Sequence, residues 1–139
     1  VPLFGQAMWV LGMIPVDRGR RDRAIQALEQ AAEKIAQGRV VLVFPEGTRS
    51  PDGEVASFKK GGFMLALQAG VPIIPIGIAG TRQLLSPGYC SVRFGQAAVS
   101  VGEPILTAGL DISDRQAIMD QVRAAISVER EAARALLVT

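Results

Sequence analysis

The sequence of 139 residues contains no histidine and one cysteine, Cys90. Histidine is the commonest general base in enzymes, so a reaction that needs one must obtain it from outside this sequence. A serine here also lacks the usual partner that would activate it as a nucleophile. A lone cysteine excludes an internal disulfide, and it excludes a zinc cluster built from cysteine and histidine. We therefore predict no metal site and no nucleophilic catalysis.

Aromatic residues and long apolar runs are also scarce. Aromatic residues make up 5% of the chain and the net charge is only +2. Because single-strand binders alternate basic and aromatic residues, we predict no nucleic-acid partner. No apolar run reaches the ~18 residues of a membrane span. The nearest, residues 1–16, contains Gln6, two prolines and two glycines. We interpret it as a core or interfacial segment.

What the chain does contain is aliphatic residues at regular spacings. Apolar positions recur every three or four residues in three segments, which predicts amphipathic helices at 20–37, 61–69 and behind Ser113, where Gln116 completes a capping-box pattern. Apolar or β-branched runs predict strands at 40–44, 72–79, 91–94 and 98–101. This alternation predicts an α/β fold with a mixed, largely parallel sheet flanked by helices. We expect a single domain over residues 1–139.

The most informative segment follows the predicted strand at 40–44. It reads Pro45-Glu46-Gly47-Thr48-Arg49, a loop at the end of a rigid element, where binding residues often lie. The planar fork of Arg49 suits a phosphate, and Gly47 permits close backbone approach or an unusual backbone angle. Glu46 would orient Arg49 or accept a hydrogen bond from a substrate hydroxyl. The alternative is a simple turn closed by a Glu–Arg ion pair.

Positive charge also gathers at two predicted helix starts. Arginines cluster before the helix at 20–37, where Arg18 ends an apolar run, and Lys59 and Lys60 precede Gly61. Cations at this end of a helix oppose its dipole, which makes sense if an anion binds there. One phosphomonoester would account for these two groups and for Arg49. A scattered basic surface remains the alternative.

Three blocks of residues together resemble a known family. They are Gly12-Met13-Ile14-Pro15-Val16-Asp17-Arg18, Phe44-Pro45-Glu46-Gly47-Thr48-Arg49-Ser50 and Val71-Pro72-Ile73-Ile74-Pro75-Ile76. In this order they resemble the glycerolipid acyltransferases, in particular the 1-acylglycerol-3-phosphate (lysophosphatidate) acyltransferases. The resemblance covers roughly residues 1–105. It implies the α/β fold of glycerol-3-phosphate acyltransferases, with the amino-terminal part missing.

The resemblance implies transfer of a fatty acyl group from acyl-CoA or acyl-carrier protein to 1-acylglycerol-3-phosphate, giving phosphatidate without a cofactor. Arg18 and Arg49, with Lys59 as a weaker candidate, would hold the substrate phosphate. Glu46, Gly47 and Thr48 would shape the substrate pocket. Residues 71–76 would be structural or would line the acyl site.

The family's catalytic histidine and aspartate form a His-x-x-x-x-Asp block, which we expect upstream of Val1. The chain by itself should then be inactive. We expect membrane association at the cytoplasmic face, with contact through the missing part and through residues 3–11, which include Trp9; a core helix is the alternative for that segment. The alternatives for function are a non-catalytic phospholipid- or phosphate-binding module, and an acyltransferase with a different lysolipid acceptor.

Overall fold

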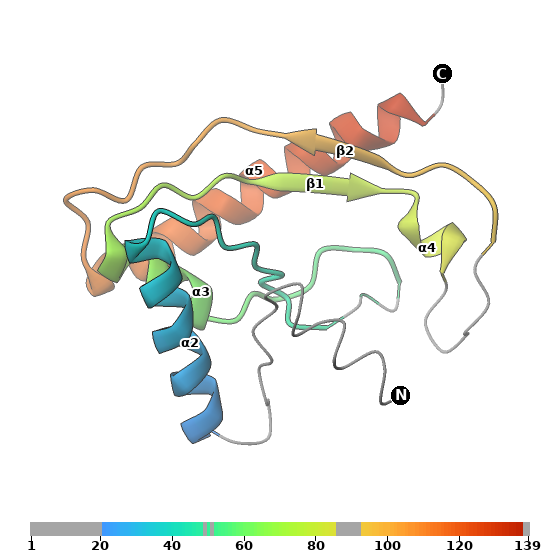
Figure 1. The fold of residues 1–139 in the computed structure, drawn as a ribbon. Coiled ribbons are helices and arrows are strands. Elements are labelled where there is room, and N and C mark those ends of the chain that lie inside the picture. The colour runs from blue at the N-terminus through green and yellow to red at the C-terminus, as the bar shows by residue number, and fades with distance from the viewer. Residues whose placement is uncertain (1–20, 49, 51, 86–92, 138–139) are drawn as a thin grey trace. The chain divides into compact units, whose positions relative to one another are not determined.

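The computed structural model describes residues 21–48, 50, 52–85 and 93–137. The chain divides into two compact units, Val1–Val43 and Phe44–Thr139. Figure 1 traces the first unit in blue to cyan and the second from green to red. The single domain expected over residues 1–139 stays a prediction.

The described part of the first unit is built on helix α2 (Arg21–Ala36), which confirms the helix predicted at 20–37. Ala27 and Ala31 are buried and lie four residues apart, one turn above the other on the same face. The helix ends where Gly38 adopts a φ of +75°, a left-handed conformation that glycine takes without steric cost.

The second unit combines helices with one pair of strands. Its elements are α3 (Gly61–Ala69), β1 (Ile76–Ala79), α4 (Thr81–Leu84), β2 (Ala98–Val101), the 3-10 turn η1 (Ile112–Asp114) and α5 (Arg115–Leu136). Strands β1 and β2 are antiparallel, with Ile76 opposite Val101 and Gly77 opposite Ser100. Helix α5 runs along one face of this pair (Figure 1). The helices predicted at 61–69 and behind Ser113 and the strand predicted at 98–101 are confirmed, and the α/β class with them. The prediction of a largely parallel sheet was wrong for the described residues, whose two strands form a single antiparallel pair.

Helix α5 and the strands approach closely because glycine lies at their contact. A Cβ atom on Gly77 would fall within 3.0 Å of the backbone of Glu129 and Arg130. The hydroxyl of Ser100 donates a hydrogen bond to Glu129 Oε2 across the same contact. Toward its amino end, α5 contributes to the apolar core of the unit, formed by Phe63, Leu67, Ile118, Met119 and Val122. The sheet and the core are therefore tied to one rigid helix.

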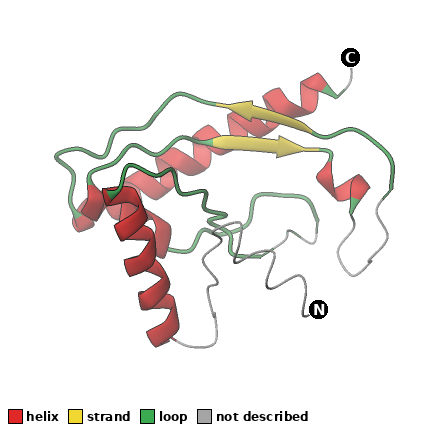
Figure 2. Ribbon diagram, viewed as in Figure 1, coloured by secondary structure: helices red, strands yellow, loops and turns green. Residues whose placement is uncertain are grey.

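The strand predicted at 40–44 was wrong, and so was the described half of the strand predicted at 91–94, whose first two residues lie outside the described residues. Residues 40–44 are loop, as Figure 2 shows for the chain leaving α2, and Val40 is 96% exposed. A strand needs a neighbour to satisfy its backbone groups, and no neighbour pairs with 40–44 among the described residues. Arg93 and Phe94 are also loop, and β2 pairs with β1 instead. That pairing places Ser100 and Gly77 against α5.

The predicted strand at 72–79 is shorter than expected. Only Ile76–Ala79 is strand, and Ile73 forms an isolated bridge with Ile105. Pro75 lies between the two, and proline cannot donate a hydrogen bond to a neighbouring strand. The strand is therefore interrupted at Pro75.

The capping box predicted at Ser113 and Gln116 was also wrong. The carboxylate of Asp111 accepts a hydrogen bond from the backbone N–H of Ser113 at 2.6 Å, and Asp114 accepts one from the backbone N–H of Asp111 at 2.9 Å. Two aspartates therefore cap the turn η1, just before α5, because their carboxylates are strong local acceptors.

Within the part of the chain that the structure describes, none of the helices combines the length and the apolar character needed to cross a bilayer.

Candidate functional site

The loop predicted to bind substrate begins with a tight turn. The backbone N–H of Gly47 donates a hydrogen bond to the carbonyl of Phe44 at 3.0 Å, and Gly47 has a φ of +69°. Side chains larger than that of glycine are strained in this conformation. The prediction that Gly47 adopts an unusual backbone angle is confirmed.

The loop then doubles back on itself, so that residues 45–48 (the near limb) lie beside residues 54–59 (the far limb). Glu46 Oε2 accepts a hydrogen bond from the backbone N–H of Ala56 at 2.8 Å. The carbonyl of Pro45 accepts one from the backbone N–H of Lys59 at 2.7 Å. A Cβ atom on Gly47 would lie 3.4 Å from Cγ of Lys59. The structure thus brings together three of the predicted site residues: Glu46, Gly47 and Lys59.

The outer end of the loop is held by side-chain hydrogen bonds around Asp52. Its Oδ1 accepts from Ser50 Oγ at 2.8 Å and from the backbone N–H of Glu54 at 2.9 Å. These two bonds, that from Glu54 first, lower the pKa of Asp52, so its carboxylate stays ionised. Gly53, with a φ of +89°, completes this turn.

Not every predicted site residue can be placed. Arg18 and Arg49 lie outside the described residues. Thr48 and Lys60 are exposed, and Lys60 directly precedes α3 as the sequence predicted. Ile73 packs against the apolar core, which favours a structural role for residues 71–76.

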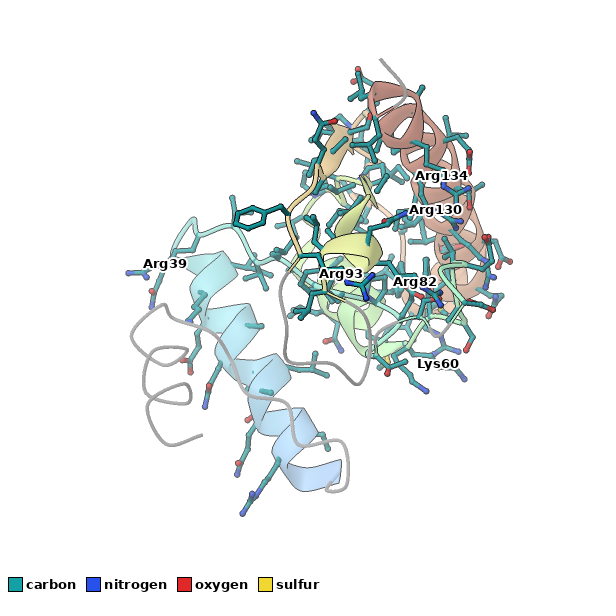
Figure 3. All side chains as sticks on the ribbon, turned by 90° about the vertical axis from the view of Figure 1, so that its right-hand side faces the viewer. Arg39, Lys60, Arg82, Arg93, Arg130 and Arg134 are labelled. Carbon is teal, nitrogen blue, oxygen red and sulfur yellow. The ribbon has the colours of Figure 1, made fainter. Side chains whose placement is uncertain are left out.

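Sequence reasoning missed three arginines on α5 that hold the far limb. Arg130 Nη2 lies 2.9 Å from both carboxylate oxygens of Glu54, and Arg134 approaches the same carboxylate at 3.6 Å. Figure 3 shows Arg130 and Arg134 projecting from α5. Arg123 Nη2 donates a hydrogen bond to the carbonyl of Val55 at 2.9 Å. The loop is therefore fixed to a helix far along the chain.

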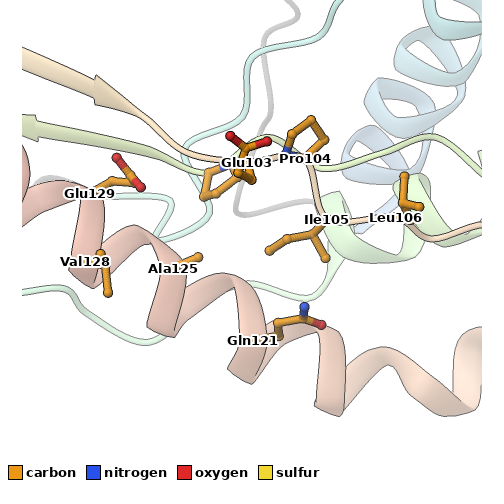
Figure 4. A pocket seen from close by; sticks show the side chains of 9 residues that line it. Glu103, Pro104, Ile105, Leu106, Gln121, Ala125, Val128 and Glu129 are labelled. Atoms are coloured by element: carbon orange, nitrogen blue, oxygen red, sulfur yellow. The ribbon is translucent and has the colours of Figure 1, made fainter.

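A concave region lies elsewhere in the second unit. It is an open hollow of about 460 Å³ beside α5, lined among others by Pro75, Glu103, Ile105, Leu106 and Val128 (Figure 4). Pro75 belongs to the segment 71–76 that could line the acyl site, but none of the described residues predicted to bind the phosphate or shape the substrate pocket lines the hollow. The size of this hollow is therefore no argument for the reaction centre, and the loop remains the candidate site.

The second unit combines helices and strands, and its loop brings Lys59 beside Glu46 and Gly47, which lie in the block that resembles glycerolipid acyltransferases. The family model described as Acyltransferase matches residues 1–79. The chain therefore belongs to the acyltransferase family.

Its relatives agree with this assignment. The chain is 41% identical over 128 residues to the 1-acyl-sn-glycerol-3-phosphate acyltransferase alpha of Mus musculus, covering 86% of this chain and 42% of that protein. It is 39% identical over 113 residues to the 1-acyl-sn-glycerol-3-phosphate acyltransferase of Saccharomyces cerevisiae, covering 79% of this chain and 37% of the yeast protein.

A solved structure also matches: the crystal structure of the 1-acyl-sn-glycerophosphate (LPA) acyltransferase PlsC from Thermotoga maritima. It aligns with a TM-score of 0.69 and 36% identity, covering 82% of this chain and 45% of that chain. The chain thus spans less than half the length of these three proteins.

Proposed function

We propose that the full-length protein transfers a fatty acyl group from a thioester, acyl-CoA or acyl-carrier protein, to the free hydroxyl of 1-acylglycerol-3-phosphate, giving phosphatidate. The observation that carries this proposal is the doubled loop, which brings Glu46 and Gly47, from the block that resembles acyltransferases, together with Lys59. The similar proteins are named for that reaction. Because a lysolipid acceptor lies in a membrane, we also propose that the protein contacts a membrane surface, at the cytoplasmic face of the membrane.

The proposed chemistry needs a base, an anion site and a leaving thiol. A base takes the proton of the acceptor hydroxyl, its oxygen attacks the thioester carbon, and the carbon–sulfur bond breaks to release the thiol. No residue of this chain is a histidine, and we propose that the base belongs to the His-x-x-x-x-Asp block of the family. Residues 1–139 alone would then be inactive.

In this proposal the chain supplies the acceptor site. Arg18, Arg49 and Lys59 bind the phosphate, since arginine pairs with phosphate through parallel hydrogen bonds. The bond from Ala56 uses one oxygen of Glu46, and a carboxylate can accept several hydrogen bonds, so Glu46 can also accept from the glycerol part. Gly47 and Thr48 complete the pocket wall.

The first test compares acceptors in the full-length protein. With labelled acyl-CoA, we expect label to enter phosphatidate from lysophosphatidate far faster than it enters diacylglycerol from monoacylglycerol, which lacks the phosphate. Equal rates would point to another acceptor. Binding of lysophosphatidate without any turnover would favour a phospholipid-binding module.

The second test removes the arginine of the loop. Arg49→Ala should lower kcat/KM for lysophosphatidate roughly 30- to 150-fold, because a hydrogen bond to a charged group is worth about 2–3 kcal/mol. Lys59→Ala should have a smaller effect in the same direction, because Lys59 is exposed and its contact is better screened by solvent. Unchanged kinetics in a folded Arg49→Ala protein would refute the phosphate assignment.

A further inference from the structure

Arg123 on α5 contacts the far limb of the loop at two residues. Each of these residues directly precedes one that is hydrogen-bonded to the near limb. Arg123 donates to the carbonyl of Val55, and the next residue, Ala56, donates its backbone N–H to Glu46. The guanidinium of Arg123 also lies 5.8 Å from the ring centre of Phe58, and the next residue, Lys59, donates to the carbonyl of Pro45. A shift of Arg123 would therefore pass through a single peptide unit to the near limb.

Arg130 provides a second anchor at the start of the far limb. It contacts both carboxylate oxygens of Glu54 at 2.9 Å, and its side chain is 12% exposed, against 69% for Glu54. Hydrogen bonding and charge from Arg130 lower the pKa of Glu54, so its carboxylate stays ionised at neutral pH. An ion pair with one partner so exposed contributes little to stability. Its two hydrogen bonds, from Arg130 Nη2 to each carboxylate oxygen, nevertheless fix the position of Glu54 against a mostly buried side chain.

Helix α5 is a rigid reference for these anchors. Val122, next to Arg123, is 2% exposed, and Ala133, near Arg130, is fully buried. Glu129, the neighbour of Arg130, is hydrogen-bonded to β2 through Ser100. The helix is thus packed into the core and against the sheet on either side of its contacts with the loop.

We propose that Arg123 and Arg130 are positioning residues, which hold Glu46 and Lys59 of the loop in the geometry that binds the acyl acceptor. This inference rests on the proposed function. It assigns a role to a helix that lies beyond residues 1–79, the part that the family model matches. Neither arginine needs to touch the substrate, because each acts through the far limb.

The test measures acceptor and donor kinetics separately in the full-length protein. Arg123→Ala and Arg130→Ala should each raise the KM for lysophosphatidate roughly tenfold, because displacing a binding group by a fraction of an ångström weakens its contacts. The KM for the acyl thioester should stay within about twofold, because the anchored limb binds the acceptor. Arg123→Lys should recover part of the loss, since lysine can still donate to the carbonyl of Val55.

Glu54→Gln keeps the test decisive if an arginine variant folds poorly, because Glu54 is largely exposed. It should raise the acceptor KM as Arg130→Ala does. The double variant should be no worse than either single variant, because each of the three variants loses the contact between Arg130 and Glu54. Arg93→Ala is the matched control: it removes an exposed arginine outside the loop and should leave both KM values unchanged.

The outcomes separate the two proposals. If the wild-type protein is active and the folded variants keep the wild-type acceptor KM, the positioning role is refuted while the proposed function stands. The same holds if acceptor and donor KM rise together, since that indicates general damage to the fold. If the wild-type protein transfers no acyl group, the proposed function fails, and this inference fails with it.

Discussion

Substituting alanine for Gly77 tests how closely β1 and α5 must pack. A Cβ atom there would come within 3.0 Å of backbone atoms of Glu129 and Arg130, a separation that Cβ atoms essentially never show. The obstacle is backbone, so no change of rotamer can relieve it. We expect the strand and the helix to move apart by about 1 Å, which forfeits a large part of their dispersion contacts.

The cost follows from this clash. Adding a methyl group to a well-packed contact typically costs about 1–3 kcal/mol, and Gly77 should lie near the upper end because both partners are main chain. Replacing glycine also lowers the entropy of the unfolded chain, which returns about 0.4–1 kcal/mol. The expected net destabilisation is about 2–2.5 kcal/mol, or roughly 8 °C in Tm for a domain of 139 residues.

Thermal unfolding of the full-length protein, followed by circular dichroism in one buffer, measures this effect. Gly70→Ala is the matched control: a Cβ atom there meets nothing within 4 Å, but Gly70 has a φ of +62°. It should cost only about 1 kcal/mol, from backbone strain alone. If Gly77→Ala unfolds at the wild-type temperature, or costs no more than Gly70→Ala, the close packing of β1 on α5 is wrong.

Two further changes test stability. Thr107→Val should lower the free energy of unfolding, measured in denaturant, by about 1–2 kcal/mol. The reason is that Thr107 is 1% exposed and its hydroxyl donates a hydrogen bond to the carbonyl of Val71 at 2.8 Å. An unchanged free energy of unfolding would contradict this hydrogen bond. Glu54 has a pKa lowered from 4.5, chiefly by its hydrogen bond to Arg130, so its contribution to stability is complete above pH 4.5 and is lost as the pH falls through the lowered pKa. The small difference in unfolding free energy between wild type and Glu54→Gln should therefore shrink below pH 4.5, and a difference that grows in acid would refute the ion pair.

Local features of the fold could be predicted from the sequence because their causes are local. Helix α2 and its end at Gly38 follow from apolar spacing and from a glycine that tolerates a positive φ. Residues 40–44 were wrongly predicted as a strand, because apolar character does not show whether a neighbour is present to pair with them. The capping box failed for a different reason: Asp111 competes for the same turn as Ser113.

The candidate site divides in the same way. Its composition could be predicted, since the chemistry of Glu46, Gly47 and Lys59 shows in the residue types and their order. The contacts from α5 that hold the loop could not be predicted, because Arg123 is 68 residues from Val55 and Arg130 is 76 residues from Glu54. A helical period predicts which face of α5 is buried, but no local pattern indicates which loop its arginines contact.

The most direct test of the central claim is to incubate the full-length protein with labelled acyl-CoA or acyl-carrier protein and lysophosphatidate, and to identify the labelled lipid. The account predicts labelled phosphatidate, formed at a strongly reduced rate by Arg49→Ala. It is contradicted if the folded protein binds lysophosphatidate but forms no labelled phosphatidate from either donor.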